Sequence, residues 1–265
     1  MRFDYHVHTP LCHHAEGEPR EYVQHAINQG LQEIGFSDHN PMPTQFDDWR
    51  MAPEDFSTYI AMIDSVRQEF PHFPIRLGME CDFIPGYENH IRDLAARVPF
   101  DYLIGSVHYI QPDWDVDNPK KLSQWSKYPT EQVWAMYFEA YARAADSKLF
   151  DFLAHPDLVK KFGFLPKGNL KRFYSAALDA IADNKIAIEI NTAGLRKDVK
   201  EMYPSREFLK EAFSRDIPIL INSDAHQPSE VGMDFDQAFA LAAEVGYRTL
   251  CRFEKRQRIP VPLAS

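Results

Sequence analysis

Metal-binding residue types recur along this sequence, and each group follows a short apolar segment. The first group is His6 and His8, which are separated by one residue. Alternate residues of a strand point to the same side, so both imidazoles can reach one ion. Later apolar segments are followed by Asp38 and His39, Glu80, His108, His155, and Asp224 and His226. A random scatter of eleven histidines would not concentrate them in this way. The pattern predicts a metal site.

The ligand set exceeds the needs of one ion, because a catalytic zinc commonly has three protein ligands and an open position. We therefore expect about two or three divalent ions, and imidazole with carboxylate favours zinc, iron or manganese. His13 and His14 are adjacent in a loop, so they project differently and one of them should join the site. Cys12 is expected to be a structural thiol.

The elements that position these residues alternate between two types. Strands are predicted over residues 3–7, 33–36, 75–79, 102–107, 152–154, 187–190 and 217–221. Helices are predicted over residues 19–29, 53–70, 88–98, 130–145, 170–184, 205–215 and 235–244. Seven strand–helix units favour an α/β fold with a closed or nearly closed parallel barrel, and a doubly wound open sheet is the alternative. The metal-capable residues would then meet at the carboxyl ends of the strands.

Four segments lie outside these strands and helices. Residues 247–253 and 256–261 are expected to add an edge strand or to pack across one end of the barrel. The long connections 40–52 and 110–129 both follow strand ends, and they either shape a substrate pocket or are tolerated surface insertions.

The composition suits a single domain of residues 1–265, since 265 residues with 45% hydrophobic content can form one sizeable core. We find no signal peptide and no apolar run long enough for a membrane span, so we expect a cytoplasmic protein. The three cysteines lack the spacing of a disulfide framework. A net charge of -10 disfavours nucleic acid as a partner but allows a small anionic substrate, because bound metals dominate the local field.

The spaced residues resemble the motifs of a known superfamily, that of polymerases and histidinol phosphatases (PHP). The matching pieces are His6-x-His8, Ser37-Asp38-His39, Glu80, His108, His155 and Asp224-x-His226. Residues 4–10, 14–17, 37–43, 189–192 and 194–196 further resemble its histidinol-phosphate phosphatase branch. The resemblance implies a distorted, TIM-like seven-unit (β/α) barrel with a trinuclear metal site.

The resemblance also implies how the ligands divide among the ions. His6, His8, Glu80 and Asp224 would hold the first ion. Glu80, His108 and His155 would hold the second, which makes Glu80 a bridging carboxylate. His14, His39 and His226 would hold the third, and His14 is chosen over His13 because its offset from His8 matches the family.

The implied activity is phosphoric monoester hydrolysis, in which L-histidinol phosphate and water give L-histidinol and phosphate in histidine biosynthesis. Metal binding lowers the pKa of water from 15.7 toward roughly 7, which supplies a hydroxide nucleophile. The implied catalytic residues are Asp224 and His226, with Lys161 and Arg196 as the first candidates to bind the phosphate and Arg50 as the third. No GxSxG, P-loop or GxGxxG motif points to a different chemistry.

Several alternatives stay open. The substrate could be another small phosphate ester, such as a nucleotide monophosphate or a sugar phosphate. An amidohydrolase-type enzyme would also use HxH and Asp, although its bridging lysine has no counterpart, and a non-catalytic metal-binding module is a further alternative. The substrate's amine and imidazole would meet Asp47, Trp49, Trp114 or Asp115, and Asp38 would orient His39. We expect a monomer or a small homo-oligomer.

Overall fold

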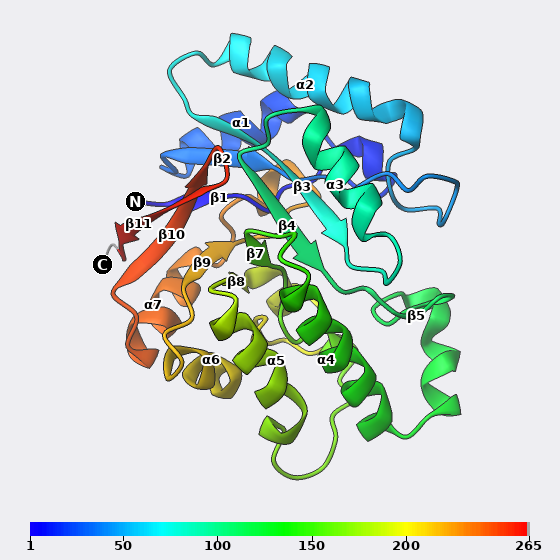
Figure 1. Ribbon diagram of the computed structural model, residues 1–265. Helices are drawn as coiled ribbons and strands as arrows, with labels where there is room; N and C mark the ends of the chain where they lie inside the picture. The colour runs from blue at the N-terminus through cyan, green and yellow to red at the C-terminus, as the bar shows by residue number, and fades with distance from the viewer. Residues whose placement is uncertain (264–265) are drawn as a thin grey trace.

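The computed structural model describes residues 1–263, and its centre is a sheet of seven parallel strands (Figure 1). The strands are β1 (Phe3–Asp4), β2 (Glu33–Phe36), β3 (Ile75–Asp82), β4 (Tyr102–Ser106), β7 (Phe152–Leu153), β8 (Ala187–Asn191) and β9 (Ile219–Asn222). They lie side by side in sequence order, and a parallel bridge between Val7 and Ala225 joins the two edges beyond the ends of β1 and β9. The predicted distorted seven-unit barrel is confirmed, and the open doubly wound sheet is excluded.

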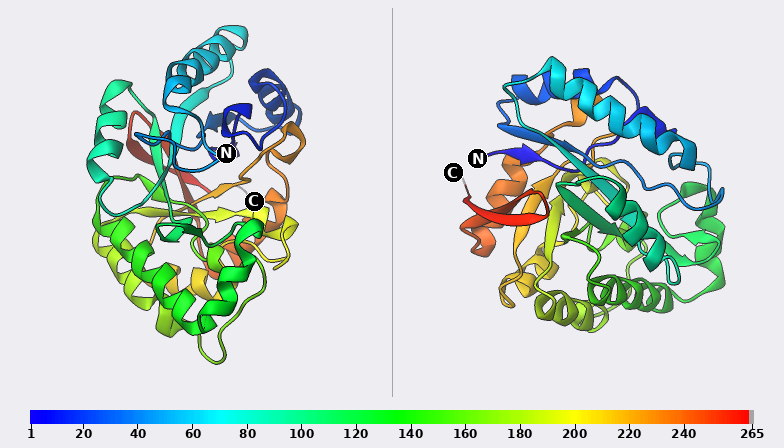
Figure 2. Two further views of the ribbon diagram at one scale, coloured as in Figure 1. Left: turned by 90° about the vertical axis from the view of Figure 1, so that its right-hand side faces the viewer. Right: turned by 45° about the horizontal axis from the view of Figure 1, so that its top comes forward.

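The helices lie outside this barrel, as the turned views make plain (Figure 2). They are α1 (Pro19–Asn28), α2 (Phe56–Glu69), α3 (Glu88–Arg97), α4 (Thr130–Asp146), α5 (Lys171–Asp183), α6 (Arg206–Phe213) and α7 (Phe235–Val245). In α4 the buried residues Trp134, Tyr137, Phe138 and Tyr141 recur at helical spacing, so one face packs on the sheet. The predicted helix 53–70 begins later, at Phe56, because Pro53–Asp55 form a short 3-10 turn.

The barrel interior is filled by aromatic side chains below the carboxyl ends of the strands. Tyr102 stacks on Tyr5 with ring centroids 5.0 Å apart and donates a 2.7 Å hydrogen bond to the carbonyl oxygen of Tyr5. Gly35 and Gly78 leave room for this ring, since a Cβ at either position would lie within 2.4 Å and 2.1 Å of Tyr102 atoms, respectively. Glu80 follows Gly78 on the same face of β3, so this packing supports the strand that carries Glu80.

The C-terminal segment forms an antiparallel hairpin of β10 (Thr249–Glu254) and β11 (Gln257–Pro262), drawn in red in Figure 1. Phe253 stacks on Phe152 at 5.5 Å, and the backbone N–H of Arg256 donates to Asp101, which lies just before β4. These contacts place the hairpin across the amino end of the barrel. Of the two predicted arrangements, packing across one end is therefore confirmed.

The long connection 110–129 has more structure than its composition predicted. It contains β5 (Tyr109–Gln111) and β6 (Trp114–Asp115), which pair as a small antiparallel sheet, followed by 3-10 turns over Pro119–Lys127. In Figure 1 β5 lies on the side of the molecule opposite to β10 and β11, beyond the carboxyl ends of the strands. Within residues 1–263, no helix combines the length and the apolar character needed to cross a membrane.

Candidate metal centre

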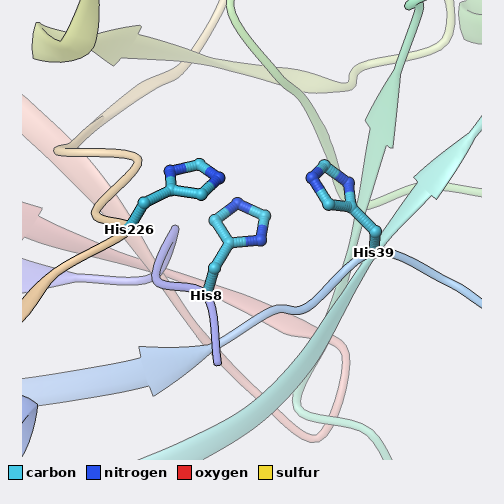
Figure 3. A group of neighbouring side chains, drawn as sticks. All are labelled: His8, His39 and His226. Carbon is cyan, nitrogen blue, oxygen red and sulfur yellow. The ribbon is translucent and has the colours of Figure 1, made fainter. Parts of the chain in front are cut away.

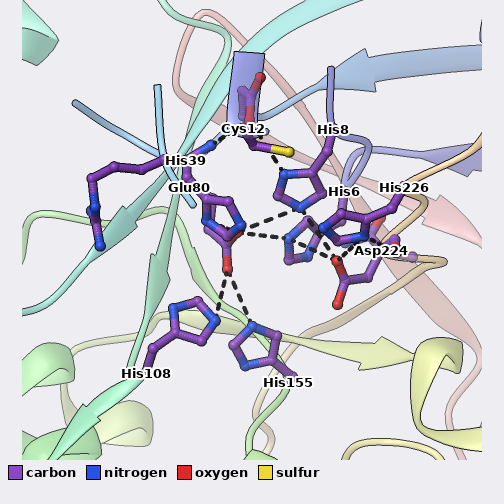
Figure 4. Close-up of polar contacts among 12 residues, drawn as sticks. His6, His8, Cys12, His39, Glu80, His108, His155, Asp224 and His226 are labelled. Carbon is purple, nitrogen blue, oxygen red and sulfur yellow. Dashed lines mark hydrogen bonds and ion pairs between the residues drawn. The ribbon is translucent and has the colours of Figure 1, made fainter. Parts of the chain in front are cut away.

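Glu80, near the end of β3, is the centre of the site (Figure 4). Its Oε2 atom lies 2.9 Å from His39 Nδ1 and 3.2 Å from His6 Nε2, while Oε1 lies 3.2 Å from His155 Nε2 and 3.8 Å from His108 Nε2. Burial alone would raise the pKa of Glu80, but the imidazoles of His39 and His6 hold it well below its usual value. Glu80 is therefore an ionised carboxylate with a separate histidine group at each oxygen.

Asp224 provides the second carboxylate of the site. Its Oδ1 atom lies 3.3 Å from His8 Nε2 and 3.7 Å from His6 Nε2, so the His6–His8 pair is enclosed between Asp224 and Glu80. Asp224 has a left-handed backbone conformation (φ 53°), which Asp tolerates better than most residues. The side-chain amide of Asn191 donates a 3.2 Å hydrogen bond to Asp224 Oδ2. His6, His8, Glu80 and Asp224 thus lie close together, and their assignment to the first ion stays a prediction.

The second group is supported by Asp82, a residue that sequence reasoning did not single out. His108 and His155 face Glu80 Oε1. On the other side of the His108 ring, Asp82 Oδ1 accepts a 2.7 Å hydrogen bond from Nδ1. Asp82 in turn forms a 2.9 Å ion pair with Arg50. Asp82 could have been found, because it shares a strand face with Glu80 two residues earlier. Arg50, a candidate for the phosphate, instead supports this histidine.

The third group is more open than the other two. The rings of His14 and His226 are tilted relative to each other, with centroids 4.6 Å apart, and Figure 3 shows His226 and His39 on either side of His8. His39 points to Glu80, whereas Cys12 joins His14 and His226 in one cluster of closely spaced donor atoms. His14 lines the central cavity, whereas His13 is not among its lining residues.

Asp38 does not orient the His39 ring, contrary to expectation. Its Oδ1 atom lies 3.5 Å from His8 Nδ1, and its Oδ2 accepts a hydrogen bond from Thr9. His39 contacts the Asp38 carboxylate through its backbone N–H, which donates to Oδ1 at 2.9 Å. Side chains of consecutive residues in an extended segment point to opposite sides, so Asp38 and the His39 imidazole diverge.

Glu189, in the middle of β8, is the buried carboxylate behind the ligand ring. Its oxygens lie 3.0 Å and 3.1 Å from His6 Nδ1 and accept from the backbone N–H of His155 at 2.8 Å and the Asn222 amide at 2.8 Å. The His6 contact leaves the His6 Nε2 atom facing Glu80 and Asp224. A charged residue within an apolar strand is the sequence signal that could have identified this role.

The change Glu189→Gln should weaken metal binding while the fold is kept. Glutamine preserves the shape but removes the negative charge beside His6 Nδ1, and loss of such a supporting carboxylate typically reduces metal affinity about 10–100-fold. Zinc titration against a competing chelator measures this. The matched control is Glu244→Gln, an exposed surface glutamate paired with Arg206. Equal zinc affinity in the two variants would contradict the role of Glu189.

The residues fit divalent metal ions by two criteria. The first is unsatisfied atoms: several buried ring nitrogens and a carboxylate oxygen have no partner with hydrogen-bond geometry among residues 1–263, namely His6 Nε2, both ring nitrogens of His8, His39 Nδ1, Glu80 Oε2 and His226 Nε2. Buried polar atoms normally have partners. The second is chemistry, since neutral imidazole and carboxylate suit zinc, iron and manganese, and burial lowers the pKa of His39 to about 4. The site can hold several ions.

A cavity of about 430 Å³ opens above these ligands. Its wall includes His14, His39, Glu80, His108, His155, Asp224 and His226, together with Trp49, Asp115, Asp117, Lys161, Lys197 and Tyr203. The Lys161 ammonium lies 2.9 Å from Asp117. Burial alone would raise the pKa of Asp117, but the charge of Lys161 outweighs it and holds this pKa well below its usual value. Arg196 is not in the cavity wall; it donates to the Ser223 carbonyl and pairs with Glu230 at 3.2 Å.

The two long connections both contribute to this cavity. Trp49 and Asp115 meet there through a 3.2 Å hydrogen bond from Trp49 Nε1. The other two candidates for the substrate's organic part lie elsewhere: Asp47 accepts from Arg50 and Tyr109, and Trp114 is buried against Trp125 and Tyr128. The connections are therefore parts of a pocket and not simple surface insertions.

A parallel barrel with carboxylates and imidazoles gathered at its carboxyl end defines a metal-dependent hydrolase of the barrel class. Comparison with known proteins makes this specific. The chain belongs to the PHP domain family, whose pattern it matches over residues 4–193.

Two curated relatives are similar to most of the chain. A probable histidinol-phosphatase of Deinococcus radiodurans is 42% identical over 97% of this chain and 98% of its own length. The histidinol-phosphatase of Bacillus subtilis is 29% identical over 88% of this chain and 96% of its own length. The fold matches the crystal structure of the Lactococcus lactis histidinol phosphate phosphatase complexed with zinc, L-histidinol and phosphate, with a TM-score of 0.82, 22% identity and coverage of 97% and 98% of the two chains.

Proposed function

We propose that this chain is a histidinol-phosphatase that hydrolyses L-histidinol phosphate to L-histidinol and phosphate. The observation that carries the proposal is Glu80, whose two carboxylate oxygens face separate histidine groups on the floor of a cavity that also holds a lysine. Such a floor suits the clustered ions of a phosphoester hydrolase. The full-length similarity to proteins named histidinol-phosphatase supports this substrate over other small esters.

When bound, divalent ions activate water and neutralise charge on the phosphoryl oxygens. The chain's own residues hold and orient the substrate. We propose that His6, His8, His14, His39, Glu80, His108, His155, Asp224 and His226 are the metal ligands. Asp224 and His226 also line the cavity, so both can contact the reacting phosphoryl group. Lys161 presents its ammonium to the same space.

The aromatic and acidic wall suits the organic part of the substrate. Trp49 offers a ring face or edge to an imidazole, and Asp115, which also pairs with Lys121 at 2.8 Å, offers a carboxylate to an ammonium or imidazolium group. A substrate with a phosphate at one end and cationic groups at the other therefore matches the charges of the cavity. The acidic balance of the chain further disfavours nucleic acid as a substrate, and we expect a cytoplasmic monomer or small homo-oligomer.

The test is phosphate release by the metal-loaded protein from L-histidinol phosphate, a nucleotide monophosphate and a sugar phosphate. We expect kcat/KM to be highest for L-histidinol phosphate, because it alone presents both an imidazole and an amine to the acidic wall. Faster turnover of another ester would replace the substrate, and stoichiometric metal without any phosphate release would refute a phosphatase.

The change Lys161→Ala should raise KM for the ester by about tenfold or more, since a hydrogen bond to a charged group contributes roughly 1.5–3 kcal/mol. Metal content should stay the same, because the ammonium group of Lys161 pairs with Asp117, which is not one of the proposed ligands. Arg196→Ala is the comparison, since Arg196 lies outside the cavity wall. Unchanged kinetics for Lys161→Ala would remove it from phosphate binding, and a larger effect for Arg196→Ala would transfer that role.

A further inference from the structure

Tyr203 is a rigidly held aromatic residue at the carboxyl end of β8. Its backbone pairs with Asn191 in both directions, with the Asn191 N–H 2.5 Å from the Tyr203 carbonyl and the reverse bond at 3.0 Å. Its ring lies edge-on to His155 with centroids 6.4 Å apart. Tyr203 therefore lies in the same layer as the proposed ligands, and its backbone position does not depend on its hydroxyl.

The Tyr203 hydroxyl is buried but has no hydrogen-bond partner among residues 1–263. The side chain lines the central cavity although the residue is only 1% exposed. Other buried tyrosines are satisfied by the protein itself: Tyr137 donates to His155, Tyr141 to Ala154 and Tyr247 to Ile217. A buried hydroxyl without a partner is unfavourable for folding, which points to a partner that is not part of the chain.

The surroundings of this hydroxyl define the partner's chemistry. A tyrosine hydroxyl keeps its proton at neutral pH, so it can donate a hydrogen bond. Of the nearby carboxylates, Asp117 accepts from Lys161 and Asp157 accepts from the backbone N–H of Ser205 through Oδ2, while Asp157 Oδ1, like the Tyr203 hydroxyl, has no partner among residues 1–263. An acceptor that enters the cavity can therefore take the Tyr203 hydroxyl, and an anion held there by lysine supplies one.

We propose that the Tyr203 hydroxyl donates a hydrogen bond to a phosphoryl oxygen of the bound substrate, on the cavity wall that also carries Lys161. This assignment rests on the proposed phosphatase function and adds a neutral donor to it. Because the hydroxyl has no partner in the protein, it is free to donate to the phosphoryl oxygen. The unpaired hydroxyl lowers the stability of the empty protein, and the hydrogen bond that forms on binding favours the bound substrate.

The test is Tyr203→Phe in the zinc-loaded protein, with binding of inorganic phosphate measured by calorimetry. We expect the Kd for phosphate to rise about tenfold or more, because a hydrogen bond to a charged group is lost. The Tm should stay equal to that of the original protein or rise, since the substitution removes an unsatisfied buried hydroxyl. A purely structural tyrosine would not give this combination.

Tyr247→Phe is the matched control, because its buried hydroxyl is satisfied at 3.1 Å by the Ile217 carbonyl and it lies outside the cavity wall. It should lower Tm and leave phosphate binding unchanged. The proposal is overturned if Tyr203→Phe binds phosphate as tightly as the original protein does. A rise in KM for the ester with unchanged phosphate binding also overturns it, because the hydroxyl would then contact another part of the substrate. Weaker phosphate binding without turnover of L-histidinol phosphate by the original protein would leave Tyr203 in place and refute the proposed substrate.

Discussion

The change Glu80→Gln should reduce kcat for the ester about a thousandfold or more and lower the bound metal per chain. Glutamine has nearly the same shape, but it carries no charge and only one of its two terminal atoms can coordinate an ion. Glu80 uses both oxygens in the structure, one toward His39 and His6 and the other toward His155 and His108. The substitution therefore separates the two groups that this carboxylate joins.

The measurement combines steady-state kinetics with elemental analysis of the same preparation. Glu69→Gln provides the control, since this glutamate lies at the end of α2 and pairs with Arg20 on the surface. It should retain full activity and metal content. If Glu80→Gln kept both its metal and its kcat, the bridging role of Glu80 would be wrong, and the ligand sets would have to be redrawn without it.

Complete removal of metal should abolish phosphate release and lower Tm by roughly 10 °C. The ions bind only the folded chain, because their ligands come from strand ends far apart in sequence and are not assembled in the unfolded state. Without the ions, the ionised Glu80 and the buried nitrogens of His6 and His8 lack coordination partners. Such uncompensated polar groups destabilise the native state.

Thermal unfolding before and after dialysis against a chelator measures this effect, with elemental analysis to establish that the metal is gone. Adding zinc back should restore both Tm and activity. The Glu80→Gln variant should respond less to the chelator, because it binds less metal at the outset. Unchanged Tm and activity in verified metal-free protein would mean that the ligand cluster serves neither stability nor catalysis.

The sequence predicted the barrel because the strand–helix alternation is local information. Each apolar run of four to eight residues and each amphipathic segment can be recognised without knowing its neighbours in space. The positions of His6, His8 and Glu80 follow from this pattern, since residues at the carboxyl ends of parallel strands must meet at one end of a barrel. Boundaries were less certain, as the later start of α2 at Phe56 shows.

The supporting residues could not be predicted in the same way, because they depend on which strands become neighbours. Glu189 reaches His6 across 183 positions of sequence, and Arg50 reaches Asp82 from a loop. Arg50 and Arg196 were reasonable phosphate candidates by charge, but packing directs them to Asp82 and to Glu230. Which group a side chain pairs with depends on its neighbours in the folded structure, and residue type alone does not specify those neighbours.

Sequence alone thus determined the class of this protein, a seven-unit barrel with a carboxylate–imidazole site, because strand spacing and residue chemistry are both written locally. Tertiary structure alone decided which side of Glu80 each histidine faces, which cation borders the cavity and where a buried hydroxyl is left unpaired. Tyr203 illustrates the difference. In the sequence it is one of twelve tyrosines, and only its unsatisfied hydroxyl in the cavity wall distinguishes it.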